Sequence, residues 1–143
     1  MDPMTDTPAR PVLIAHTAGH MTAAFGAARA TGRAVLVRSA EGAAATLGAG
    51  VFAAMVEDAR QAAPGAEVLA VLDCGTDAGA AMNAIRLGLP AIRLDAAADI
   101  MAKIRDMADA AGVVIDESAA PVLDLLGEPD PAAAAQAWIE TAA

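Results

Sequence analysis

Aromatic residues and cysteine are nearly absent from this chain of 143 residues. It has no Tyr, and its only Phe and Trp residues are Phe25, Phe52 and Trp138. The core must therefore consist of close-packed Ala, Val, Leu, Ile and Met, with helices lying near a sheet. The single cysteine, Cys74, excludes a disulfide within the chain and is typical of a reducing compartment, which predicts a cytoplasmic protein.

Positive charge is also scarce. The formal net charge is −9, and no Lys or Arg follows Arg105. Because binding to phosphate groups needs clustered cations, this acidic composition argues against a nucleic-acid partner and against an anionic membrane surface. The stretch 11–28 lacks charged residues, but it contains two His and two Gly. It has neither the basic flank of a signal peptide nor the apolar continuity of a membrane span.

Short apolar runs alternate with helical patterns along most of the chain. Residues 1–10 are polar with two prolines and predict a disordered tail, whereas residues 11–143 contain no linker and predict a single α/β domain. The patterns predict five strands, at 12–15, 34–37, 68–72, 91–94 and 113–115. The helices expected among and after them include 43–63, 77–87, 97–111 and 119–126.

The five predicted strands are apolar throughout, which is typical of a parallel sheet covered by helices on both faces. Right-handed crossovers leave two ways to arrange such a sheet. We therefore expect an α/β fold with five parallel strands, either half-TIM-barrel-like or a flavodoxin-like three-layer sheet. Periodicity does not distinguish the two.

The most informative stretch is 67–95, an apolar strand ending in Asp73-Cys74, a short helix and a second strand ending at Asp95. Side chains at the carboxyl ends of parallel strands line the crevice where α/β proteins bind ligands. Asp73 is therefore the candidate catalytic residue, and Cys74 is a candidate metal ligand or reactive thiol. The alternatives are an Asp that accepts hydrogen bonds from loop N–H groups and a Cys that packs as a small buried hydrophobe.

The same stretch resembles the amino-terminal half of the class II, metal-dependent fructose- and tagatose-bisphosphate aldolases. These TIM barrels carry a motif of the form LDHGTD at the third strand, followed by a helix, AIxxGF and a strand that ends in Asp. The corresponding residues here are Leu72 to Asp77, then Ala84 to Leu89, then Leu94-Asp95. The family's PVIL-x-x-S-x-G segment is similar to Ala34 to Ser39 followed by Gly42.

The resemblance implies a role for three residues. Asp73 corresponds to a catalytic acid or base near the substrate hydroxyl, and Ser39 corresponds to a serine that touches the substrate. Cys74 stands where the family has a zinc-ligating His, and a thiolate also binds Zn²⁺. The family's other ligand histidines and its phosphate loops lie in the second half of the barrel, which these residues do not reach. The resemblance therefore implies an aldolase-like half-barrel without aldolase activity.

Two histidines follow the first predicted strand. Zn²⁺ is the one cofactor for which the sequence offers ligands, and the metal-site hypothesis consists of His16, His20 and Cys74. The alternative is a turn at a helix start, in which a histidine side chain acts as a polar cap.

The remaining candidates are ligand-binding residues at neighbouring strand ends. The Glu41-Gly42 turn precedes a predicted helix, so it either holds an anion at the helix N-terminus or is an ordinary helix start. The arginines at strand ends either neutralise a ligand phosphate or pair with Asp95 and Asp116. The ligand-binding set is Arg38, Ser39, Gly42 and Asp95.

Three functions stay open at this point. The first is binding of a small ligand, phosphorylated or not, or of a partner, at the carboxyl ends of the strands. The second is a metal-dependent aldehyde-lyase whose site is completed across a dimer. The third is a non-catalytic interaction subunit whose acidic C-terminal helix docks on another protein.

We predict that the chain forms a homodimer, because half of a barrel has unpaired strand edges and an apolar inner face that must be covered. Light scattering at micromolar concentration is expected to give twice the 14.2 kDa mass of one chain. A monomer under these conditions would contradict the prediction.

Overall fold

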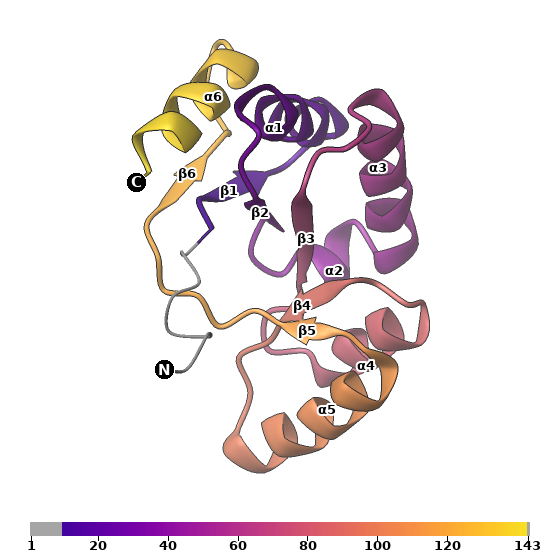
Figure 1. The fold of residues 1–143 in the computed structure, drawn as a ribbon. Coiled ribbons are helices and arrows are strands. Elements are labelled where there is room, and N and C mark those ends of the chain that lie inside the picture. Colours follow the sequence, from indigo (N-terminus) through magenta and orange to yellow (C-terminus); the bar gives the residue numbers. More distant parts are fainter. Residues whose placement is uncertain (1–9, 143) are drawn as a thin grey trace, which may run out of the picture.

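Six parallel strands form one sheet in the computed structural model, which describes residues 10–142 (Figure 1). The order across the sheet is β5-β4-β3-β2-β1-β6, so the first five strands lie in the order in which they occur in the chain. The predicted α/β class, with parallel strands alternating with helices, is confirmed. The strands are β1 Val12–Ala15, β2 Val35–Ser39, β3 Val68–Asp73, β4 Ala91–Arg93, β5 Val114–Ile115 and β6 Val122–Asp124.

Six helices connect and follow these strands, and their ends agree with local sequence signals. Thr17, Asp77 and Asp130 cap three of them by accepting a hydrogen bond from a backbone N–H in the first turn. Gly32 ends one of these three helices and Gly112 ends a fourth, both in the left-handed conformation. The helices are α1 Ala18–Thr31, α2 Ala43–Thr46, α3 Ala49–Ala62, α4 Ala78–Arg86, α5 Ala98–Ala111 and α6 Pro131–Thr141. Of the predicted tail, residues 1–9 lie outside the described part of the chain.

The two faces of the sheet are covered differently, whereas the sequence predicted helices on both. The main core joins one set of alternate strand residues, such as Val37 and Leu72, to buried residues of the helices, such as Phe52. The opposite face has only a small apolar cluster, to which Ala120 from the β5–β6 connection contributes. Figure 1 shows the helices around the outer side of the curved sheet and this connection on the other side. Successive right-handed crossovers between adjacent strands place their helices on one face.

The predicted helix at 119–126 is wrong, because this segment contains β6 instead. Val122 and Leu123 pair with Val12 and Leu13 of β1. The strand pairing satisfies backbone groups along β1 that a helix would leave unpaired, and it overrides the local helical pattern. Pro121, which immediately precedes β6, suits the start of an edge strand because it has no N–H to donate.

The predicted helix at 43–63 is interrupted. Gly48, with φ of +86°, separates the short α2 from α3. The break changes the phase of the helical pattern, so that Phe52, Val56 and Ala59 are buried. Val51, next to Phe52 on the same helix, is 52% exposed.

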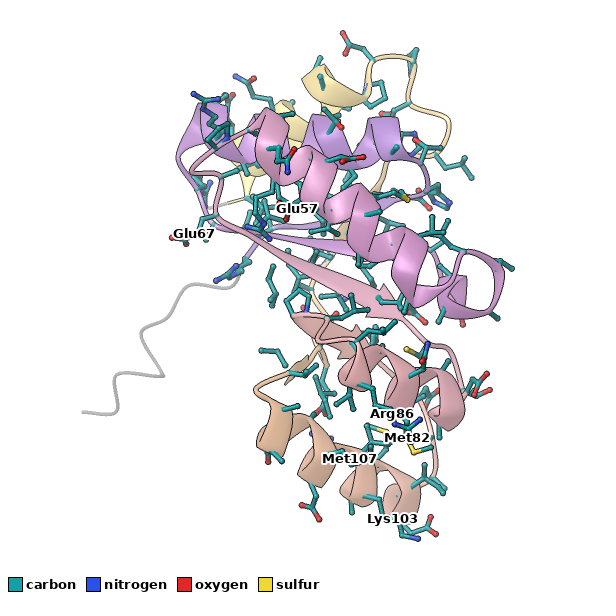
Figure 2. All side chains as sticks on the ribbon, turned by 90° about the vertical axis from the view of Figure 1, so that its right-hand side faces the viewer. Glu57, Glu67, Met82, Arg86, Lys103 and Met107 are labelled. Carbon is teal, nitrogen blue, oxygen red and sulfur yellow. The ribbon has the colours of Figure 1, made fainter. Side chains whose placement is uncertain are left out.

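Methionine side chains of α4 and α5 pack against the main core. Met82 on α4 and Met107 on α5 are partly buried and contact the main core. Figure 2 shows the two side chains in the space between these helices, with Arg86 and Lys103 nearby. Flexible thioethers fill a gap here that the scarcity of aromatic rings would otherwise leave.

None of the helices within residues 10–142 has the length and apolar character needed to cross a bilayer.

Candidate site at the carboxyl ends of the strands

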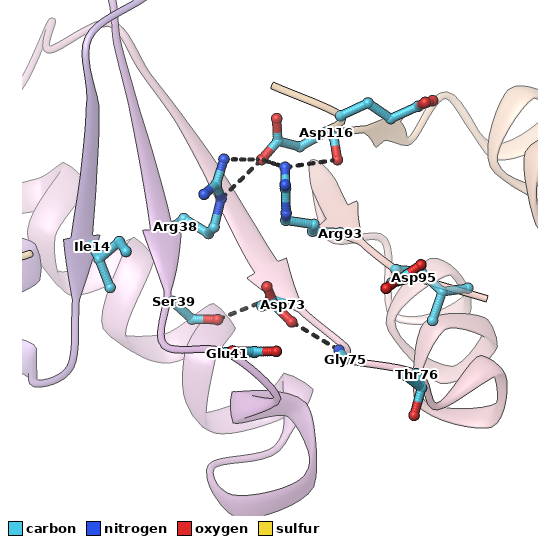
Figure 3. Close-up of a pocket in the computed structure, with 12 residues that line it drawn as sticks. Ile14, Arg38, Ser39, Glu41, Asp73, Gly75, Thr76, Arg93, Asp95 and Asp116 are labelled. Atoms are coloured by element: carbon cyan, nitrogen blue, oxygen red, sulfur yellow. Dashed lines mark hydrogen bonds and ion pairs between the residues drawn. The ribbon is translucent and has the colours of Figure 1, made fainter. Parts of the chain in front are cut away.

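A polar pocket of about 530 Å³ lies at the carboxyl ends of β2, β3 and β4 and beside the residues that follow β5 (Figure 3). Alternate residues of a strand point to the same face, and the strand-end residues Arg38, Asp73 and Arg93 lie on the face opposite the helices. Asp73 and Arg93 are direct partners in the β3–β4 register. The lining residues are Ile14, Arg38, Ser39, Glu41, Asp73, Gly75, Thr76, Arg93, Leu94, Asp95, Asp116 and Glu117.

One carboxylate joins two arginines at one side of this pocket. Oδ2 of Asp116 lies 3.0 Å from Nε and 2.9 Å from Nη2 of Arg38, and 3.2 Å from Nη1 of Arg93. Its other oxygen accepts a hydrogen bond from the Ser118 N–H at 2.9 Å. The Asp116 side chain is 2% exposed, so this interaction takes place away from water. The predicted pairing of strand-end arginines with Asp116 is confirmed.

Asp73 holds two loops together through a single oxygen. Its Oδ1 accepts hydrogen bonds from the N–H groups of Gly42 at 3.0 Å and Gly75 at 2.8 Å. Its own N–H donates to Oγ of Ser39 at 2.8 Å, and this hydroxyl donates to the carbonyl oxygen of Ala40. Gly75 has φ of +58°, which glycine adopts at no steric cost. Asp73 therefore makes the loop contacts that we considered as the structural alternative to catalysis.

Two charged residues in the pocket keep a polar atom free. Asp73 is 7% exposed and Arg38 is 8% exposed. Within residues 10–142, Oδ2 of Asp73 and Nη1 of Arg38 have no hydrogen-bond partner. No side-chain nitrogen or oxygen of the described residues is both buried and unpartnered, so both free atoms reach solvent. Because both residues line the pocket, these atoms are available to a molecule that enters it.

The predicted ligand-binding residues come together, with one qualification for Gly42. Arg38, Ser39 and Asp95 all line the pocket. The N–H of Gly42 is bonded to Asp73, so the anion that we considered for this turn is supplied by the chain itself. The Ser39 hydroxyl is also engaged on both sides by backbone groups, which leaves it a positioning role.

Cys74 lies on the opposite face of the sheet from Asp73, because neighbouring residues of an extended strand point in opposite directions. It is 2% exposed within the main core, and its Sγ contacts the carbonyl oxygen of Leu72 at 3.7 Å. Burial, together with the negative charges of Asp73 and Asp77, raises the pKa of the thiol to about 12. Cys74 is therefore a neutral packing residue in the folded protein.

The two histidines form the start of α1 and are not brought together with Cys74. Nδ1 of His20 accepts a hydrogen bond from the N–H of His16, while the N–H of His20 donates to Oγ1 of Thr17. Burial and the neighbouring His16 lower the pKa of His20. Nε2 of His16 lies 2.7 Å from Oδ1 of Asp124 on β6. Nowhere in residues 10–142 do three His, Cys, Asp or Glu side chains form a group suited to a metal ion.

Sequence reasoning left several pocket residues out of the predicted site. Arg93 was considered for neutralising a ligand phosphate or for pairing but was not included in the ligand-binding set. Asp116 was considered only as a pairing partner, and Thr76 and Glu117 were not considered as site residues. The signal for Arg93 was present in the sequence, because it occupies a strand end with the same parity as Asp73. Asp116 follows the short β5, so its position at the pocket is known only from the observed strand register.

No family model matches the chain, and no curated protein matches its sequence.

We predict that Asp116→Ala lowers the free energy of unfolding by about 3 kcal/mol or more, because two arginines then lose their shared buried partner. Urea unfolding measures the change. The matched control is Glu117→Ala, since the Glu117–Arg105 ion pair is exposed and is expected to contribute little. Equal effects of the two substitutions would contradict the assignment of Asp116 as the buried centre of this network.

We predict that the Cys74 thiol of the folded protein reacts with a disulfide reagent at pH 8 at least about a hundredfold more slowly than in urea, because only the thiolate attacks. A Cys74→Ala/Ala102→Cys protein provides the control, since position 102 is exposed and its thiol is expected to react rapidly. Equally fast labelling of native Cys74 would show that the thiol is not held in the core.

Proposed function

We propose that the protein binds a small polar ligand in the pocket at the carboxyl ends of β2, β3 and β4, through side chains and without a metal ion. The observation that carries this proposal is the pair of free polar atoms, Oδ2 of Asp73 and Nη1 of Arg38, on residues that are more than nine-tenths buried. Both atoms reach solvent on side chains that line the pocket, so a polar ligand that enters can bind to them.

A zinc-dependent lyase has less support from this geometry. A catalytic zinc site needs about three protein ligands and an open position. Cys74, the residue that the aldolase resemblance places at the metal, lies in the core on the helix side of the sheet. The histidines are engaged at the start of α1 and with Asp124. Asp73 keeps the free oxygen that an acid or base requires, but the pocket supports binding more directly than it supports aldolase chemistry.

The third function, docking through the C-terminal helix, also has less support. The apolar side of α6 is used within the chain, where Ala135 and Ile139 are buried. Nε1 of Trp138 donates to the carbonyl oxygen of Val12, and Arg33 donates to the carbonyl oxygen of Ile139. A helix held in this way offers a partner mainly its polar side.

The proposal is tested by adding mixtures of small polar metabolites to isotope-labelled protein and recording backbone amide spectra. We expect a binding compound to shift the amide signals of Gly42, Gly75 and Thr76, which surround Asp73. Asp73→Asn keeps the oxygen that accepts the two loop hydrogen bonds but replaces the free oxygen by a donor, and we expect it to weaken binding at least about tenfold.

The matched control for this experiment is Asp99→Asn, which removes an equal charge from an exposed position on α5 outside the pocket. It is expected to leave binding unchanged. Shifts confined to other parts of the molecule, or equal affinity of the two variants, would refute a binding site at Asp73.

A further inference from the structure

We infer that the ligand is a zwitterion, with its carboxylate bound by Arg38 and Arg93 and its ammonium group bound by Asp73. This inference rests on the proposed function and adds the chemical class of the ligand. It follows from how positive and negative charge are distributed in the pocket, from the atoms that the chain leaves unpartnered, and from the net charge that a ligand meets there.

The lining as a whole is acidic. Two positive and five negative residues face the pocket, which gives a formal charge of −3. Glu117 is paired with Arg105 outside the pocket, and the hydrogen bond and charge of this arginine keep the pKa of Glu117 low. Even with Glu117 neutralised by its partner, the pocket remains negative. A ligand with two or more negative groups would be repelled, whereas a ligand with an ammonium group is attracted.

The charge is separated within the pocket. Arg38 and Arg93 share the single carboxylate of Asp116, so this side carries an excess of one positive charge. Nη1 of Arg38 is free, and in Arg93 the described hydrogen bonds all use Nη1, which leaves Nη2 as a second donor. Both arginines line the pocket and share one carboxylate, so their remaining donors suit a second carboxylate, which accepts hydrogen bonds through two oxygens.

The negative side lies in the same pocket: Asp73 is the cross-strand partner of Arg93, but the guanidinium groups of both arginines bind Asp116. Figure 3 shows Asp73 and Glu41 away from the arginine pair, with Asp95 at a third position. The free Oδ2 of Asp73 is an acceptor only, so it requires a donor from the ligand. Asp95 is exposed, and its backbone N–H is bonded to Gly75, which leaves its side chain at the rim. An ammonium group supplies both the donors and the positive charge that this side lacks.

The inference is tested with three probes that share a small skeleton: serine, glycerate, which replaces the ammonium group by a hydroxyl, and ethanolamine, which lacks the carboxylate. The other common amino acids are titrated in the same way, since the pocket has room for a larger side chain. We expect at least one amino acid to shift the amide signals of Gly75 and Thr76. Its affinity should exceed that of glycerate and of ethanolamine at least about tenfold, the effect of losing one charge-assisted hydrogen bond.

Substitution of a rim carboxylate gives a second readout that does not endanger folding. Asp95→Asn is expected to weaken binding of the amino acid and of ethanolamine but not of glycerate, and Asp99→Asn is expected to change none of them. If glycerate or another anion binds best, and its binding depends on Asp73, the inference of a zwitterionic ligand is wrong and the proposed function stands. If none of the amino acids and none of the metabolites binds at Asp73, both are wrong.

Discussion

The two-residue repeat of a β-strand is the constraint on which the candidate site depends. In β3 it places Leu72 and Cys74 among the helices and Asp73 on the other face. The parallel register then brings residues of the same parity from neighbouring strands to the same edge, with Arg93 beside Asp73. The polar pocket is thus a consequence of strand pairing and does not require a specialised loop.

Burial of charge determines how this edge is built. Asp116 is almost completely removed from water, a position that is costly for a carboxylate unless it is paired. Two arginines and a backbone N–H satisfy it, and the same carboxylate holds both guanidinium groups in place. The buried carboxylate of Asp73 is also hydrogen-bonded, but the backbone N–H groups bind only one of its two oxygens. The fold therefore pairs these buried charges and still leaves Oδ2 of Asp73 and Nη1 of Arg38, both on residues that line the pocket, without a hydrogen-bond partner among residues 10–142.

Much of the fold could be predicted from the sequence, because apolar runs and caps are local signals. The first strand, Val12–Ala15, and the helix after Asp77 follow directly from such signals. β6 could not be predicted in this way, because only its pairing with β1 makes three residues a strand. The break at Gly48 depends on the glycine's positive φ, which composition alone does not reveal.

The sequence indicated which residues lie at the strand ends, but not which of them face the same side of the sheet. The strand ends pointed to Asp73, Arg38 and Asp95, and all three line the pocket. Grouping Asp73 with Cys74 in one site ignored the alternation of side chains along β3, and the metal hypothesis depended on that grouping. Pairing of the arginines with Asp116 was among the predicted alternatives, but the sharing of its one carboxylate by both depends on the long-range pairing of β4 with β5, which no local pattern encodes.

We propose that Asp73 faces a ligand site and that its neighbour Cys74 does not. The affinity of one bound metabolite for the Asp73→Asn and Cys74→Ala proteins distinguishes the two residues. We expect a loss of at least about tenfold for Asp73→Asn, the size of one charge-assisted hydrogen bond, and no change in affinity for the folded Cys74→Ala protein. Loss of binding in Cys74→Ala, with Asp73→Asn unaffected, would contradict the proposal.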